Sequence, residues 1–209
     1  ADLDKIVGQI TGKPLEVIVT HMHPDHAGCI KYFDKVWMHR ADTVLVPQHA
    51  ADYQGEFLYM EEGQVFDLGG RKLEVAWMPG HTPGSVVLLD KANGDCYSGD
   101  AFGSGEVWLQ CVPMSPIATF HESCCRMEKL MKEGHIKDIW CGHYPYLKSS
   151  LPLAYIQTMI RISHRLMNGD QEGSEPYSNY FIKMPPTARK LAEGRAMIVY
   201  DSTNIPEAR

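Results

Sequence analysis

Apolar residues in this chain recur at two spacings, and together they predict a mixed α/β protein. A helix is expected over residues 2–10, where Leu3, Ile6 and Ile10 fall on one face and Gly12 follows the end. Residues 15–20 are apolar and rich in β-branched side chains, which predicts a buried strand. Shorter strands are expected at 36–38, 64–68, 72–77, 85–90, 96–98, 136–141 and 196–200.

Two long helices are predicted in the second half of the chain. The first is expected to open with a capping box at Thr119-x-x-Glu122 and to end at Gly134. The second spans residues 152–167 and stops at an Asn-Gly pair. Weaker helical segments are expected at 26–33 and 41–50.

Two stretches lack a clean period. Residues 51–63 carry several aromatic side chains and predict a loop or broken helix, which either lines a pocket or packs at the edge of the core. Residues 101–118 form a long connection interrupted by glycine and proline, and long connections inside a compact domain are often functional. Residues 170–188 are polar and proline-rich.

The length of 209 residues suits one domain with a sizeable core. We expect residues 1–150 to form a motif-bearing part and residues 151–209 to add a C-terminal helix and the last strand. The net charge of −6 argues against a nucleic-acid partner. No apolar stretch is long enough to predict a membrane span.

Cysteine usage bears on the compartment. The six cysteines form no C-x-x-C pair, and a chain of this length needs no disulfide framework. Reduced thiols and a cytoplasmic location are therefore expected.

The candidate chemistry begins directly after the run at 15–20. Three imidazoles and one carboxylate follow within six positions, namely His21, His23, Asp25 and His26. Neutral imidazole and carboxylate are ligands that zinc and iron accept, and so many of them at one strand end favour a cation between them. A metal site is therefore expected here.

Three further residues share one context. His81, Asp100 and His143 each lie beside a glycine at or near the end of a predicted strand. Ligands gathered from several strand ends make a rigid site. His39, His49 and His164 have no such pattern, and we interpret them as packing or surface residues.

Taken in order, these motifs resemble the metallo-β-lactamase-fold superfamily of metallohydrolases. The resemblance covers about residues 1–150 and is carried by the following motifs: Thr20-His-x-His-x-Asp-His26, Pro79-Gly-His-Thr-Pro-Gly84, Ser98-Gly-Asp100 and Gly142-His143. It implies a four-layer αββα sandwich with the metal site at one edge of two sheets.

The resemblance also implies how the ligands divide between two divalent metal ions. Three histidines would hold the first metal: His21, His23 and His81. The second metal would be held by Asp25, His26 and His143, with Asp100 bridging both. Zinc is the expected metal, with iron or manganese as alternatives.

Two such cations would make hydroxide available near neutral pH for attack on a carbonyl. Asp25 is expected to help hold the metals and orient the nucleophile. Tyr144, next to His143, is a candidate for assisting the oxyanion or the leaving group.

The superfamily shares a site rather than a substrate. The aspartate at position 100 resembles the glyoxalase II and lactonase-like branches, which implies hydrolysis of a small ester, thioester or lactone. A mono-iron sulfur dioxygenase of the same fold is the alternative enzyme. A catalytically inactive metal-binding or regulatory module is the alternative outside catalysis.

One departure from the family pattern concerns the beginning of the chain. Members carry an N-terminal β-hairpin before the histidine motif, whereas only 20 residues precede His21 here. We expect the first strands of one sheet to be missing from this chain. Truncation or cleavage would explain this, as would a homodimer or a second polypeptide that supplies the strands. The 209 residues alone are expected to fold poorly, which reversible cooperative unfolding of the monomer would contradict.

Overall fold

The computed structural model describes residues 2–109, 115–180 and 183–206. Its α-helices are α1 (Leu3–Ile10), α2 (Pro24–Ala27), α3 (Val46–His49), α4 (Ile117–Lys132), α5 (Tyr144–Leu147) and α6 (Leu153–Met167). Its strands are β1 (Lys35–His39), β2 (Glu56–Met60), β3 (Val65–Asp67), β4 (Lys72–Trp77), β5 (Val86–Asp90), β6 (Asp95–Gly99), β7 (Glu106–Trp108), β8 (Asp138–Cys141), β9 (Glu175–Pro176), β10 (Ala188–Glu193) and β11 (Ala196–Asp201). Short 3-10 turns cover Ile30–Tyr32, Arg40–Leu45 and Ser202–Asn204.

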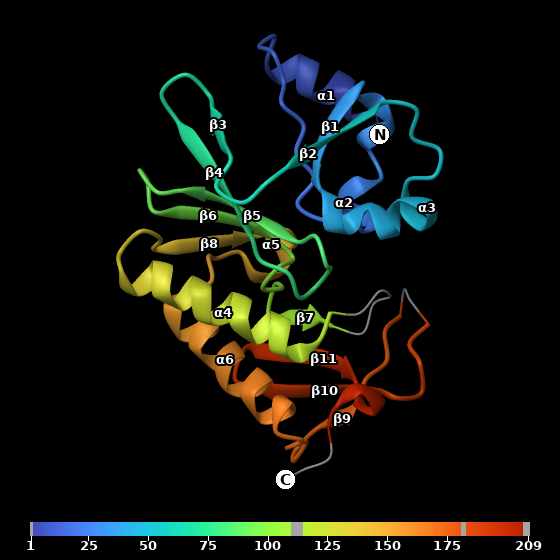
Figure 1. Cartoon of the computed structure of the whole chain (residues 1–209), viewed down its shortest axis with the longest axis vertical. Helices are drawn as coiled ribbons and strands as arrows, with labels where there is room; N and C mark the ends of the chain where they lie inside the picture. Colours follow the sequence, from blue (N-terminus) through green and yellow to red (C-terminus); the bar gives the residue numbers. More distant parts are fainter. Residues whose placement is uncertain (1, 110–114, 181–182, 207–209) are drawn as a thin grey trace.

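The strands form three sheets, which confirms the α/β class (Figure 1). The largest has the order β3-β4-β5-β6-β8, and the next has the order β7-β11-β10-β9. Strands β1 and β2 pair in parallel as a third, two-stranded sheet. Strands β6 and β8 are also parallel, with α4 between them in the chain, so both strands end at the same edge of their sheet.

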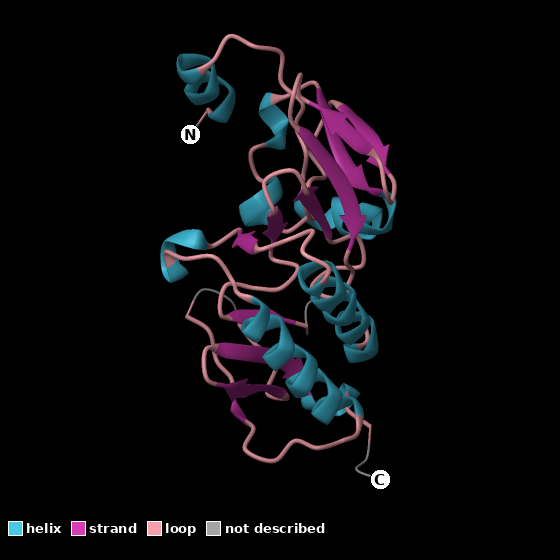
Figure 2. Ribbon diagram, turned by 90° about the vertical axis from the view of Figure 1, so that its left-hand side faces the viewer, coloured by secondary structure: helices cyan, strands magenta, loops and turns pink. Residues whose placement is uncertain are grey.

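The main core joins the five-stranded sheet, α4, α6 and the four-stranded sheet. Helices α4 and α6 pack against each other (Figure 2). The apolar positions predicted from helical spacing in α4 are buried, including Phe120, Cys124 and Met127. Every residue of β5, a strand inside the sheet, is buried. Helix α1, by contrast, has no buried residue.

Several sequence-based expectations are wrong in detail. The strand expected at 15–20 is an extended segment with a single parallel bridge, from Ile18 to Trp37. The loop expected at 51–63 contains β2, and the connection at 101–118 contains β7. Both strands pair in parallel with a distant strand, which no local period reveals. The sequence does not predict strand β10 either, because apolar and polar residues do not alternate along it.

The capping box predicted for α4 is wrong as well. The helix begins after Pro116, so Thr119 lies inside its first turn and does not cap it. Proline fixes its own φ and cannot donate a backbone hydrogen bond, so it suits a helix start.

Five cysteines are free thiols, which agrees with the expectation of reduced cysteines: Cys29, Cys96, Cys124, Cys125 and Cys141. Cys111 lies outside the described residues. Across the described ranges, the helices are all too short or too polar to cross a membrane.

Candidate metal centre

The seven candidate ligands come from four places in the chain that meet at one edge. His21 and His23 precede α2, and α2 itself carries Asp25 and His26. His81 lies in the loop between β4 and β5. Asp100 directly follows β6, and His143 lies two residues after β8. Because β6 and β8 are parallel neighbours, Asp100 and His143 are brought together although 42 residues separate Gly99 from Cys141 in the chain.

Three histidines form a first ligand group, in which one nitrogen of each ring lies within 4.8 Å of the others: His21, His23 and His81. Nδ1 of His23 lies 2.9 Å from Nε2 of His81. Nδ1 of His81 lies 2.9 Å from the carbonyl oxygen of Trp108, to which it donates as a neutral ring. That bond leaves the lone pair on Nε2 directed at the other two histidines.

The remaining four residues form a second ligand group, in which one ligand atom of each side chain lies within 4.8 Å of the others: Asp25, His26, Asp100 and His143. Nε2 of His143 lies 3.0 Å from Oδ2 of Asp100 and 3.3 Å from Oδ2 of Asp25. Nε2 of His26 lies 3.4 Å from the same oxygen of Asp100. Oδ2 of Asp100 is also 4.0 Å from Nε2 of His81, so Asp100 stands between the two groups.

The donor atoms of this centre fit metal ions. Within the described parts of the chain, four buried side-chain polar atoms lack a hydrogen-bond partner, and three belong here: Nε2 of His21, Nε2 of His26 and Oδ1 of Asp100. Buried polar atoms are rarely left unpaired, because desolvation without a partner costs free energy. A cation would satisfy all three.

Gly142 allows the second ligand group to close. A Cβ at this position would lie 2.5 Å from Cε1 of His26 and 2.6 Å from Oδ1 of Asp100. The backbone amide of Gly142 donates to the carbonyl of Gly99, 2.8 Å away, which holds the two loops together. Only glycine leaves room for both side chains here.

Burial and the neighbouring rings keep the first ligand group neutral. Burial lowers the pKa of His21 and of His81, and it lowers the pKa of His23 to about 3. The neighbouring histidines lower the pKa values of His21 and His23 further. Neutral imidazole is the form that binds metal ions, so this group needs to lose few protons before binding near neutral pH.

In the second ligand group, the pKa shifts of Asp100 and His143 favour the charged forms. Burial alone would raise the pKa of Asp100, but the side chains of His143, His26 and His81 hold it well below its usual range. The pKa of His143 is raised, chiefly by its hydrogen bond to Asp100. Asp100 is therefore a carboxylate at neutral pH.

Sequence reasoning missed two groups that hold the ligands. The carbonyl of Trp108 orients His81 through the backbone, so residue type carries no signal for it. Asp42 is 1% exposed and contacts both loops of the first ligand group. It lies in a weakly patterned segment with no motif around it, so spacing could not single it out.

Tyr144 and the remaining histidines singled out in the sequence lie outside the two ligand groups. Tyr144 is the first residue of α5 and follows His143, and its ring centroid lies 5.8 Å from that of Trp140. His49 approaches His23 at 5.8 Å between ring centroids, and His39 stacks on Trp77. His164 lies on α6 beside Asn168.

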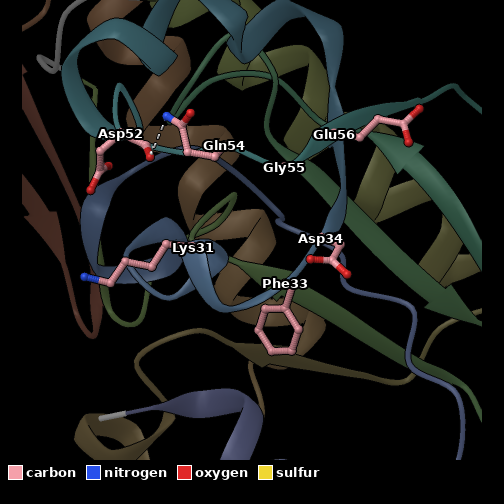
Figure 3. A pocket seen from close by; sticks show the side chains of 7 residues that line it. All are labelled: Lys31, Phe33, Asp34, Asp52, Gln54, Gly55 and Glu56. Atoms are coloured by element: carbon pink, nitrogen blue, oxygen red, sulfur yellow. Dashed lines mark hydrogen bonds between the residues drawn. The ribbon is translucent and has the colours of Figure 1, made fainter.

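An open hollow of about 500 Å³ lies away from the ligands, beside β2 and the turn before it (Figure 3). Three acidic side chains and one lysine contribute to its lining, and none of the seven candidate ligands takes part: Lys31, Phe33, Asp34, Asp52, Gln54, Gly55 and Glu56.

Comparison with known proteins agrees with this geometry. Residues 5–121 match the model of the metallo-beta-lactamase superfamily, which is more than half of the chain. The chain belongs to this superfamily. The resemblance inferred from its four motifs is thereby confirmed, and so is the fold class.

Among curated relatives, acyl-coenzyme A thioesterase MBLAC2 from Homo sapiens is 28% identical over 159 residues. That match covers 63% of this chain and 57% of the relative, so the chain spans a little over half of the relative's length. A hydroxyacylglutathione hydrolase from Synechococcus is 24% identical, with 68% of this chain and 53% of the relative covered.

Solved structures agree on the fold. TTHA1623, solved in a di-iron-bound form, superposes with a TM-score of 0.55 at 24% identity and covers 74% of this chain and 81% of its own. The metallo-beta-lactamase IND-7 superposes with a TM-score of 0.58 at 14% identity, covering 78% and 74%.

Proposed function

We propose that this chain is a dinuclear metal-dependent hydrolase that cleaves a small thioester. The observation that carries the proposal is the pair of ligand groups with the Asp100 carboxylate between them. One group supplies three neutral imidazoles and the other adds two carboxylates, which together suit two divalent cations. When bound, such cations supply hydroxide near neutral pH and polarise a carbonyl oxygen.

The residues of the chain have distinct proposed roles. The first ligand group would hold one cation and the second ligand group the other, with Asp100 shared. Asp25 has a side chain that is 56% exposed, and its Oδ2 lies 3.3 Å from His143, so it would face an entering substrate while holding the second cation. Tyr144 stays a prediction for assisting the oxyanion or the leaving group. Zinc is the proposed metal, with iron and manganese as the alternatives.

The relatives support a thioester over the ester and the lactone. One is named as an acyl-coenzyme A thioesterase and another as a hydroxyacylglutathione hydrolase, and both names describe acyl groups carried on sulfur. Both proteins are longer than the part matched here, so a thioester substrate is a proposal for this chain and not a property carried over from them.

Metal analysis combined with a substrate panel tests the proposal. Protein loaded with Zn²⁺ should hold two ions per chain and release free thiol from an acyl-coenzyme A or an acyl-glutathione. It should act more slowly on an aryl ester and a lactone. The His81→Ala variant is the control, because it removes one ligand of the first group. One iron per chain with oxygen consumption would instead identify a sulfur dioxygenase, and no turnover across the panel would leave a metal-binding module.

A further inference from the structure

Asp42 is a buried carboxylate outside the two ligand groups. It lies in the 3-10 turn Arg40–Leu45, and only 1% of its surface is exposed. Burying a carboxylate is costly unless its oxygens accept hydrogen bonds. Its hydrogen-bond partners therefore indicate what the charge stabilises.

Those partners lie on the two loops that carry the first ligand group. Oδ2 of Asp42 accepts a hydrogen bond of 2.9 Å from the backbone amide of Met22, the residue between His21 and His23. The same oxygen accepts one of 2.9 Å from the hydroxyl of Thr82, directly after His81. Oδ1 accepts a 2.6 Å bond from the backbone amide of Gly84.

The surroundings fix this arrangement tightly. Thr82 and Ser85 are buried, and their hydroxyl oxygens lie 2.9 Å apart. Ser85 also accepts from the backbone amide of Thr82 at 3.0 Å. A Cβ on Gly84 would lie 2.6 Å from Cγ of Asp42, so the loop passes against the carboxylate with no space to spare.

We propose that Asp42 is a positioning residue that sets the separation between the two loops of the first ligand group and so raises its affinity for a metal ion. The physical reason is that one rigid carboxylate receives donors from both loops, so neither loop can shift without breaking a buried hydrogen bond. Ligand–metal distances in a well-formed site lie within about 0.2 Å of their standard values, so the loops that carry the ligands must be held closely. Partners of this kind outside the ligand shell typically contribute about 10- to 100-fold in metal affinity. The inference rests on the metal centre proposed above.

Asp42→Asn is the direct test, because it keeps the shape of the side chain and changes its hydrogen bonding. The asparagine side chain has one oxygen and one NH₂ group where Asp42 has two oxygens. Its NH₂ group must face either the backbone amide of Gly84 or the donors on Met22 and Thr82, so at least one hydrogen bond is replaced by two donors facing each other. The matched control is Asp90→Asn. The side chain of Asp90 is fully buried, but its partners are Arg71, directly before β4, and Asn93, in the β5–β6 hairpin, and neither belongs to a ligand loop.

The measurement is Co²⁺ affinity by competition with a chelator, together with the visible absorption spectrum of bound Co²⁺. Circular dichroism of each metal-free variant verifies that it is folded. Asp42→Asn should bind Co²⁺ at least about tenfold more weakly and show an altered spectrum, whereas Asp90→Asn should keep wild-type affinity and spectrum. Wild-type affinity and spectrum in folded Asp42→Asn would overturn the proposal, even if its stability fell as much as in the control.

If Asp42→Asn does not fold, Thr82→Val decides the question. This variant removes only the hydroxyl that donates to Asp42 and keeps the volume of the side chain. It should weaken Co²⁺ binding by a smaller factor, and unchanged binding would overturn the proposal. A wild-type chain that binds no Co²⁺ would instead refute the metal centre itself, which separates failure of the proposed function from failure of the role of Asp42.

Discussion

Replacing Gly142 with alanine should displace the second ligand group while leaving the first in place. The backbone of Gly142 lies outside the left-handed region, so alanine can adopt its conformation. The added Cβ would lie 2.5 Å from Cε1 of His26. The optimal separation between two carbon atoms is about 3.5 Å, so an unstrained contact requires the ring to move by about 1 Å. Ligand–metal distances in a well-formed site lie within about 0.2 Å of their standard values, so a shift of this size would disrupt ligation by His26.

The expected result is a chain that holds one metal ion tightly and the second at least about tenfold more weakly, which is about 1.4 kcal/mol. Overpacking should also lower the free energy of unfolding by about 1–3 kcal/mol. The assay is metal content by mass spectrometry after equilibration with chelator-buffered Zn²⁺. Gly12→Ala is the control, because nothing lies within 4 Å of a Cβ there. Two ions bound at wild-type affinity in Gly142→Ala would refute the reasoning.

The remaining predictions concern charge, pH and the substrate pocket. Asp100→Ala should lower metal occupancy and activity together, and unchanged metal content would exclude a bridging role. The free energy of unfolding of metal-free protein, measured in urea, should fall as pH falls from about 6.5 toward 3. The reason is that the histidines of the first ligand group bind protons in the unfolded chain but stay neutral in the folded one, where their pKa values are lowered. A free energy of unfolding that does not change over this range would contradict the prediction. Above pH 6.5 the raised pKa of His143 acts in the opposite sense, so that its contribution is lost as the ring deprotonates. Trp108→Ala should alter substrate preference but keep metal content, because His81 binds the backbone carbonyl of residue 108. Loss of metal in that variant would show a structural role instead.

Much of the fold could be predicted because its signals are local. The buried face of α4 and the apolar strand β5 follow from spacing alone. Strand β2 could not be predicted, because its place depends on parallel pairing with β1 and not on its own period. The segment at 15–20 shows the reverse error, since strand-like residues there make one bridge only.

The sequence by itself determined the chemistry of the centre. His21, His23 and His26 lie so close in the chain that any fold keeps them near one another, and their residue types favour a metal ion as the partner. Only the tertiary structure decided which distant residues join them. Asp100 and His143 meet because β6 and β8 run parallel, and Asp42 reaches both loops of the first ligand group from a segment that carries no motif. Residue type and local spacing identify the candidate ligands, whereas the separations between them arise from pairing and packing between segments far apart in the chain.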